Sequence, residues 1–249
     1  MQMKIFEAFA LSEREVVSFV GGGGKTTLMF RLAGEIPLGR NVIVTTTTKI
    51  YPPASACFPV VFWKEGLEKE LAEHFKSGLK PVVASGLLKD NKLKGINAGQ
   101  VSVLQNHAEY VLVEADGSRG FSLKGHMGYE PVIPGSTTIL IVVIGADVLG
   151  KNLNGNNVHR PEIVSCLTGR EIGSRIDAEM IAELITHPAG ILRDCPSWAR
   201  VVPFINKADR LKDPGEGYRL GSLLLGEKIK KVVLGSAIAE NPVLDIITG

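Results

Sequence analysis

The sequence predicts an α/β fold, with a mostly parallel sheet of about seven strands and helices on both faces. Short apolar runs, typical of buried strands, alternate with longer segments of helical spacing. Polar or glycine-rich segments follow several runs directly, where open α/β sheets bind ligands. The runs are 16–20, 41–45, 81–85, 110–113, 137–144, 201–205 and 231–234. We expect the 249 residues to form a single nucleotide-binding domain, 1–249.

Composition excludes several classes of protein. Hydrophobic residues make up 45% and charged residues 22%, an ordinary globular balance, and the net charge of +2 does not indicate a nucleic-acid or membrane partner. Cys57, Cys166 and Cys195 form no C-x-x-C pair, which argues against a disulfide framework or a cysteine-built zinc site. The N-terminus lacks a signal-peptide pattern, and no apolar run could span a bilayer. We therefore expect a cytoplasmic protein.

The first apolar run leads into a phosphate-binding loop. The loop contains four glycines, Gly21, Gly22, Gly23 and Gly24. Lys25, Thr26 and Thr27 follow, and then a segment of helical spacing. Glycine allows a sharp turn and close approach of the backbone to a ligand, and N–H groups at a helix start attract anions. We expect Lys25 to reach the β- and γ-phosphates of a nucleotide and the Thr26 hydroxyl to bind Mg²⁺.

This loop is shorter than the usual P-loop. The common pattern has a glycine six residues before the lysine, a position that Phe19 occupies here. The sequence instead fits G-x-x-G-K-T-T, a shorter loop that also occurs in Mur-type ligases. The order of strand, loop, Lys-Thr-Thr and helix predicts a P-loop NTPase-type fold. The alternative is a glycine-rich turn with a solvated lysine.

Threonines and a lysine follow the second run. The segment Thr46-Thr47-Thr48-Lys49 lies at the carboxyl end of the run 41–45 and precedes Tyr51-Pro52-Pro53. Because ligands bind at this edge of an open α/β sheet, we expect Thr47 and Lys49 to contact the nucleotide. The alternative is a threonine-rich strand end, since threonine favours strands.

Two carboxylates follow the run 110–113. Acidic side chains at a strand end can coordinate Mg²⁺ directly or through water. Glu114 or Asp116 is expected to hold the metal and the other to orient water, while the N–H group of Gly117 could donate to a γ-phosphate. Lys124, farther on, is a weaker candidate for a phosphate or substrate contact. The alternative is a solvent-facing acidic turn.

The most apolar run, 137–144, predicts a central strand and leads to a long polar loop. The loop ends in His159-Arg160, just before Pro161, which suits the first turn of a helix. Arg160 could stabilise charge on a transferring phosphoryl group. The alternative is a loop that merely caps the helix.

The run 201–205 is followed by an N-K-x-D motif, Asn206 to Asp209. A carboxylate at Asp209 can accept the N1–H and the 2-amino group of guanine, which adenine does not present together. Asn206 can contact the base edge, and the stem of Lys207 can lie over the ring. Ser236 and Ala237 follow the run 231–234 and could back the base with N–H groups. These residues predict GTP or GDP as the ligand, with ATP possible.

The remaining segments have recognisable patterns. Residues 1–14 predict a short helix or edge strand, and the tail from Glu240 a short helix. Other predicted elements are a helix at 66–77, a hairpin over 87–96, a helix at 97–107 and a helix at 177–187 capped by Asp177.

Five stretches together resemble one family over nearly the whole chain. GGGGKTT, VIVTTTTKIYPP, VLVEADGSRG, VIGADVLGKNLNGNNVHRPE and FINKAD, in this order, resemble the YqeC-like accessory proteins of selenium-dependent molybdenum hydroxylases. The resemblance implies a P-loop nucleotide hydrolase that serves maturation of a molybdenum cofactor enzyme, with that hydroxylase or its maturation proteins as partners. A looser resemblance reaches the GTPases that deliver nickel or cobalt, from which the chain departs in its short loop and in lacking a Cys or His metal-transfer cluster.

The expected reaction is Mg²⁺-assisted hydrolysis or transfer of a terminal phosphoryl group, with Lys25, Glu114, Asp116 and Arg160 as catalytic residues. Three alternatives stay open. The chain could be an ATP-dependent kinase or ligase for a small, pterin-like substrate. It could be a nucleotide-gated chaperone with little turnover, whose loops 46–53 and 150–162 dock a client. It could also be a nucleotide-binding fold without activity.

Overall fold

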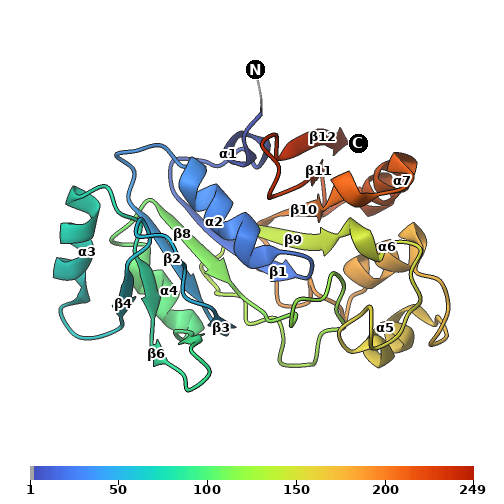
Figure 1. Ribbon diagram of the computed structural model, residues 1–249, viewed down its shortest axis with the longest axis horizontal. Helices are drawn as coiled ribbons and strands as arrows, with labels where there is room; N and C mark the ends of the chain where they lie inside the picture. Colours follow the sequence, from blue (N-terminus) through green and yellow to red (C-terminus); the bar gives the residue numbers. More distant parts are fainter. Residues whose placement is uncertain (1–2) are drawn as a thin grey trace.

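The computed structural model describes residues 3–249 and is built around a large, mostly parallel sheet (Figure 1). Within these residues the sheet has nine strands in the order β12-β11-β10-β9-β1-β8-β2-β5-β4. Every neighbouring pair is parallel except β11 and β12. The strands are β1 Glu15–Gly21, β2 Val42–Thr46, β4 Val60–Phe62, β5 Val82–Ala84, β8 Tyr110–Glu114, β9 Ile139–Gly145, β10 Arg200–Asn206, β11 Lys231–Gly235 and β12 Val243–Thr248.

A small antiparallel sheet lies beside the carboxyl end of β2. It consists of β3 (Lys49–Ile50), β6 (Gly86–Leu87) and β7 (Leu93–Lys94), so the hairpin predicted over 87–96 is confirmed. The segment after β7 is tied to the loop that follows β2. Gly95 N–H donates to Thr48 O at 2.8 Å, and Ile96 N–H donates to Thr46 O at 2.9 Å.

Helices cover both faces of the main sheet, as the sequence predicts. Side chains of α1 and α2 pack on one face with Val17 and Phe19 of β1. On the other face, α3 and α4 pack with Val16, and α6 and α7 pack on β9 and β10. The helices are α1 Ile5–Ala8, α2 Lys25–Glu35, α3 Leu67–Lys76, α4 Ala98–Leu104, α5 Pro161–Thr168, α6 Ala178–Thr186 and α7 Pro214–Leu224, with short 3₁₀ turns η1 Ala146–Val148 and η2 Ala208–Arg210.

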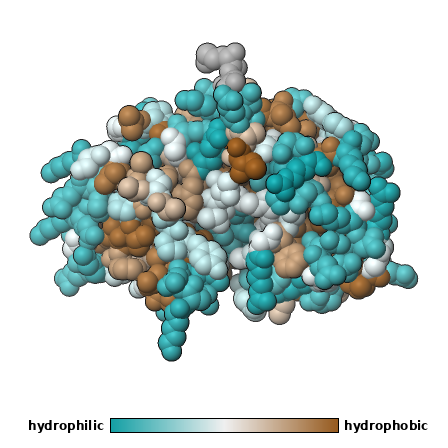
Figure 2. All heavy atoms as spheres, in the orientation of Figure 1, coloured by the Kyte–Doolittle hydropathy of each residue, from teal (hydrophilic) through white to brown (hydrophobic). Residues whose placement is uncertain are grey.

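The face of the molecule that Figure 2 shows is mainly hydrophilic. In the orientation of Figure 1, hydrophilic residues cover most of the visible face, and apolar residues form small separate groups (Figure 2). None of the helices between residues 3 and 249 is long and apolar enough to cross a bilayer.

The structure corrects several expectations. The tail from Glu240 forms the edge strand β12, because Ile246 and Ile247 alternate between the cores on the two faces of the sheet. The main sheet has nine strands within the described residues, since β4 and β12 join the predicted seven. β9 lies inside the sheet, but the middle strand is β1. The expected N-terminal helix is α1, and residues 1–2 lie outside the described range.

Candidate functional site

The glycine loop connects β1 to α2 and is held close to neighbouring backbone. Gly23 and Gly24 have φ values of 84° and 113°, in the region that favours glycine. A Cβ atom on Gly23 would lie 2.4 Å from the backbone nitrogen of Gly145, and one on Gly24 would lie 2.7 Å from Asn206 Nδ2. The run of glycines is therefore required by packing as well as by backbone conformation.

Three N–H groups of the loop bond within the protein. Gly21 N–H donates to Asp116 Oδ2 at 3.0 Å, Gly22 N–H to Val143 O at 2.9 Å and Gly23 N–H to Phe121 O at 2.8 Å. The anion-attracting groups that remain are those at the start of α2. This helix begins at Lys25 after the N-cap Gly24, and no side chain of residues 3–249 caps it. Its first-turn N–H groups and dipole therefore favour an anion.

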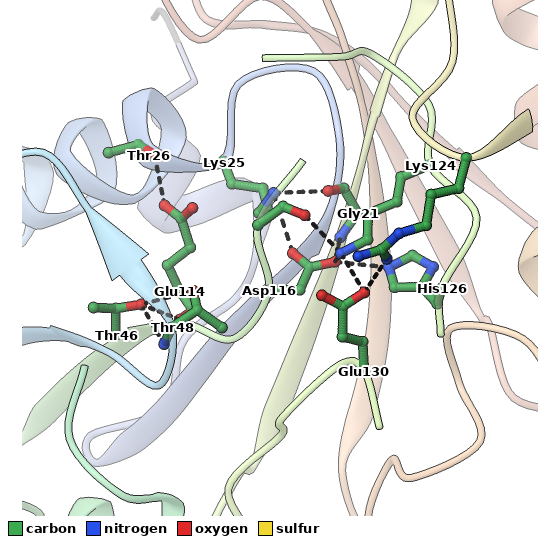
Figure 3. Close-up of polar contacts among 12 residues, drawn as sticks. Gly21, Lys25, Thr26, Thr46, Thr48, Glu114, Asp116, Lys124, His126 and Glu130 are labelled. Atoms are coloured by element: carbon green, nitrogen blue, oxygen red, sulfur yellow. Dashed lines mark hydrogen bonds and ion pairs between the residues drawn. The ribbon is translucent and has the colours of Figure 1, made fainter. Parts of the chain in front are cut away.

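Lys25 points into the protein beneath the loop. Its Nζ donates to Gly21 O at 2.7 Å and lies 3.1 Å from Asp116 Oδ1 (Figure 3). Lys25 is 3% exposed and Asp116 is fully buried. Asp116 Oδ2 also lies 2.7 Å from His126 Nε2 and 3.4 Å from Lys124 Nζ. Burial by itself raises the pKa of Asp116, but Lys25, His126 and Lys124 hold that pKa far below its usual range.

Glu114 points the other way from Asp116, toward α2 (Figure 3). The Thr26 hydroxyl donates to Glu114 Oε2 at 2.5 Å. Burial raises the pKa of Glu114, and the Lys25 charge and the Thr26 hydrogen bond only partly oppose that rise. The two carboxylates therefore differ: Glu114 lies beside the Thr26 hydroxyl, where the motif expects Mg²⁺, and Asp116 lies among cationic side chains.

The donors fit a metal that is shared with a ligand. Within residues 3–249, no group of three or more His, Cys, Asp or Glu side chains could hold a metal ion. Magnesium commonly binds one or two protein groups and completes its coordination with phosphate oxygens and water. Thr26 and Glu114 are suited to this kind of site.

A chain of ion pairs continues outward from Asp116. Lys124 Nζ lies 3.0 Å from Glu130 Oε2 and donates to Gly117 O at 2.6 Å, and Glu130 also accepts a hydrogen bond from Arg160. Burial opposes ionisation of Glu130, but hydrogen bonds from Arg160 and Lys124 lower its pKa overall. Arg160 is the N-cap of α5, with φ 59°. Its guanidinium is thus linked to Lys25 through Glu130, Lys124 and Asp116.

The N-K-x-D segment contacts the glycine loop. Asn206 Nδ2 donates to Gly23 O at 2.7 Å, and Asn206 Oδ1 accepts from Lys207 N–H at 2.9 Å and Ala237 N–H at 2.8 Å. This buried amide joins the ends of β1, β10 and β11. Asp209 is exposed, and no hydrogen bond or ion pair joins its side chain to the described part of the chain. Its carboxylate is therefore available for a ligand.

Several other residues that are predicted to contact the nucleotide form hydrogen bonds or ion pairs within the protein. Lys207 Nζ donates to Ser122 Oγ at 2.8 Å and lies 3.2 Å from Asp147 Oδ2. The Thr47 hydroxyl donates to Val132 O at 2.9 Å. Lys49 is exposed and lies opposite Lys94 in the small sheet. Ser236 is buried, with its N–H group donating to Pro242 O at 2.9 Å. The nucleotide contacts of these residues stay predictions.

Sequence reasoning did not assign His126, Glu130, Ser122 or Asp147 to the site, and treated Lys124 as a weak candidate. Most of these side chains lie between β8 and β9, on a segment with no regular secondary structure. A segment without periodicity does not reveal which side chains face the interior. Their nearness to Lys25 and Lys207 follows only from the fold.

Comparison with known proteins gives two matches. A family model described as "YqeC protein" matches residues 17–162. A protein of Escherichia coli strain K12 named "Uncharacterized protein YqeC" is 32% identical over 232 residues, which cover 92% of this chain and 90% of that protein. The family match includes the glycine loop, both carboxylates and Arg160.

Proposed function

Because the chain belongs to the YqeC protein family, we propose that it is a single P-loop nucleotide-binding domain that hydrolyses GTP with Mg²⁺. The observation that carries this proposal is the hydrogen bond from Asn206 Nδ2 to Gly23 O. It joins the guanine-type motif directly to the phosphate-type loop, although the two are 183 residues apart in sequence. Each motif alone is weak evidence, but their contact brings the two to one place, as binding of a single nucleotide requires.

The residues take distinct roles in this proposal. The first turn of α2 and Lys25 bind the terminal phosphates. Thr26 and Glu114 hold Mg²⁺, which neutralises charge on the phosphoryl oxygens. Glu114 is buried, and its ionised form gains most from a nearby cation. Asp209 selects guanine by accepting from its ring and amino N–H groups.

The partner is proposed from the resemblance. The five stretches shared with YqeC-like accessory proteins support a role in maturation of a selenium-dependent molybdenum hydroxylase. In that role the client enzyme or one of its cofactor-maturation proteins would stimulate slow intrinsic hydrolysis. Measuring GTP turnover with and without the purified client tests this part separately from nucleotide binding.

Calorimetric titration with GTP, GDP and ATP in the presence of Mg²⁺ tests the nucleotide assignment. We expect guanine nucleotides to bind at least about tenfold tighter than ATP, roughly 1.4 kcal/mol. Asp209→Ala should lose that preference without loss of stability, because Asp209 is exposed. Asp90→Ala, which changes an exposed aspartate in the hairpin, is the matched control and should keep it.

Two outcomes would overturn parts of the proposal. If ATP binds as tightly as GTP, the guanine assignment is wrong, and an ATP-dependent kinase or ligase becomes the better hypothesis. If no nucleotide binds and Lys25→Ala changes nothing, the glycine loop is not a phosphate site.

A further inference from the structure

We propose that Asp116 is a positioning residue that competes with phosphate for the Lys25 ammonium. The strength of the Asp116–Lys25 ion pair then determines the affinity of the loop for a phosphate group. This inference rests on the proposed function, since Lys25 is the phosphate lysine of that proposal. It assigns Asp116 a role different from the metal ligand that the sequence suggested.

The position of Lys25 supports the competition. Its Nζ lies between Gly21 O and Asp116 Oδ1, at 2.7 and 3.1 Å, on the interior side of the loop. A lysine with 3% exposure in this place presents little of its charge to a ligand at the start of α2. At most two of its three N–H groups face these oxygens, so a phosphate oxygen at the start of α2 would compete with Asp116 for the remaining donor capacity and for the charge of the ammonium.

Asp116 is well placed to control that movement. Its Oδ2 is supported by Gly21 N–H at 3.0 Å, His126 Nε2 at 2.7 Å and Lys124 Nζ at 3.4 Å. Its Oδ1 has Lys25 as a charged neighbour, but no well-aligned hydrogen bond within residues 3–249. The carboxylate is therefore fixed at one oxygen and bonded to Lys25 less strictly at the other. Lys25 can leave while Asp116 stays in place.

The surrounding charges favour the exchange. Lys25, Lys124 and Arg160 are cationic, whereas Asp116 and Glu130 are the two carboxylates that contact them. A phosphate group would supply a further anion to this cluster. After Lys25 moves, the Lys124 ammonium still lies 3.4 Å from Asp116 Oδ2 and His126 Nε2 still lies within hydrogen-bond distance of it, which lowers the cost of giving up one partner.

The hydrogen bond between Thr26 and Glu114 distinguishes the positioning role of Asp116 from metal binding. Thr26 donates to Glu114, and no hydrogen bond or ion pair joins Asp116 to Thr26 among the described side chains. A metal ligand at Asp116 would make Asp116→Asn weaken Mg²⁺-dependent binding. A competitor for Lys25 would make the same variant bind phosphate more tightly when Mg²⁺ is absent.

The test measures two properties of Asp116→Asn in EDTA. The first is binding of inorganic tripolyphosphate, which contains no base. We expect at least about tenfold tighter binding than in the unchanged protein. The second is the rate at which an amine-specific reagent modifies Lys25, followed by mass spectrometry with exposed Lys69 as internal reference. We expect at least about fivefold faster modification of Lys25 and no change at Lys69.

Asp147→Asn is the matched control. It removes the same charge just after β9, which is separated from β8 by β1, but Asp147 contacts Ser122, Lys207 and Lys151 rather than Lys25. Modification of Lys25 should stay within about twofold of the unchanged protein, because Asp147 forms ion pairs with Lys207 and Lys151 and none with Lys25 among the described residues. Equal effects of the two substitutions would overturn the proposal, since net charge alone would then explain them.

A second variant keeps the test decisive if Asp116→Asn does not fold. Lys124→Met removes a competing cation, so Asp116 should hold Lys25 more tightly. Modification of Lys25 should slow relative to Lys151→Met, which loses the same charge at an exposed position. Unchanged Lys25 reactivity in Lys124→Met would contradict the inference.

If tripolyphosphate binding and reactivity shift as expected but ATP is preferred, the GTPase proposal fails and this inference stands. If GTP is hydrolysed but the reactivity of Lys25 is the same in the variants as in the unchanged protein, the GTPase proposal stands and this inference fails.

Discussion

Asn206→Ala should destabilise the protein strongly, independently of any ligand. The Asn206 side chain is 4% exposed and makes three hydrogen bonds, to Gly23 O, Lys207 N–H and Ala237 N–H, at 2.7, 2.9 and 2.8 Å. Alanine would leave these backbone groups without that partner. Each buried group that loses its hydrogen bond costs about 1–3 kcal/mol. Since water can reach some of them after the truncation, we expect a loss of about 3–5 kcal/mol in the free energy of unfolding.

Urea unfolding at constant temperature measures this loss. With a slope of about 3 kcal/mol per molar urea, the midpoint should fall by about 1–1.7 M while the slope stays the same. Asn157→Ala is the control. The half-buried Asn157 side chain donates one hydrogen bond, to Asn152 O at 2.9 Å, so this variant should lose less than about 1 kcal/mol.

Asn206→Asp separates the three bonds. The carboxylate can still accept from Lys207 N–H and Ala237 N–H, but it cannot donate to Gly23 O. Because the ionised carboxylate would be buried and would face Gly23 O, this variant should lose at least as much stability as Asn206→Ala, although it keeps both acceptor bonds. If Asn206→Ala lost no more than Asn157→Ala, the idea that this amide joins three strand ends would be refuted.

Three further predictions concern the loop and the buried carboxylates. Gly23→Ala should cost more than about 2 kcal/mol in urea unfolding, because its Cβ would meet Gly145 backbone at 2.4 Å, whereas Gly34→Ala, in open space on α2, should gain about 0.5–1 kcal/mol. Folding lowers the pKa of Glu130, so its contribution to stability is present above the unfolded pKa of about 4.3 and is lost as pH falls through the folded pKa. In Glu130→Gln the free energy of unfolding should therefore fall less steeply as pH decreases from about 5 to 2.5. Burial raises the pKa of Glu114, so the native protein loses stability as pH rises from the unfolded pKa of about 4.3 through the folded pKa. Glu114→Gln lacks this loss, so its stability in urea unfolding should rise with pH relative to the unchanged protein. A stability difference that does not change with pH would contradict the burial argument.

Local pattern was sufficient for most elements of the fold. The apolar runs predicted seven strands of the main sheet, because buried parallel strands read as continuous apolar segments. Asp177 was predicted as a helix cap, and its carboxylate accepts from Met180 N–H at 2.8 Å. The expected helix after Glu240 was wrong because pairing with β11 decided the conformation of a short segment that has little preference of its own.

For the candidate site too, sequence pattern predicted some features and the tertiary structure decided others. The sequence by itself determined which residues gather at the carboxyl edge of the sheet, since strand ends in a parallel sheet lie together. The roles of Glu114 and Asp116 depended on the tertiary structure. Parallel pairing places Glu114 beside Phe19, and Asp116 lies beyond the strand, within reach of Gly21 and Lys25. A shift of one residue in this register would turn each strand side chain to the opposite face, and register is a property of two strands that lie far apart in the chain.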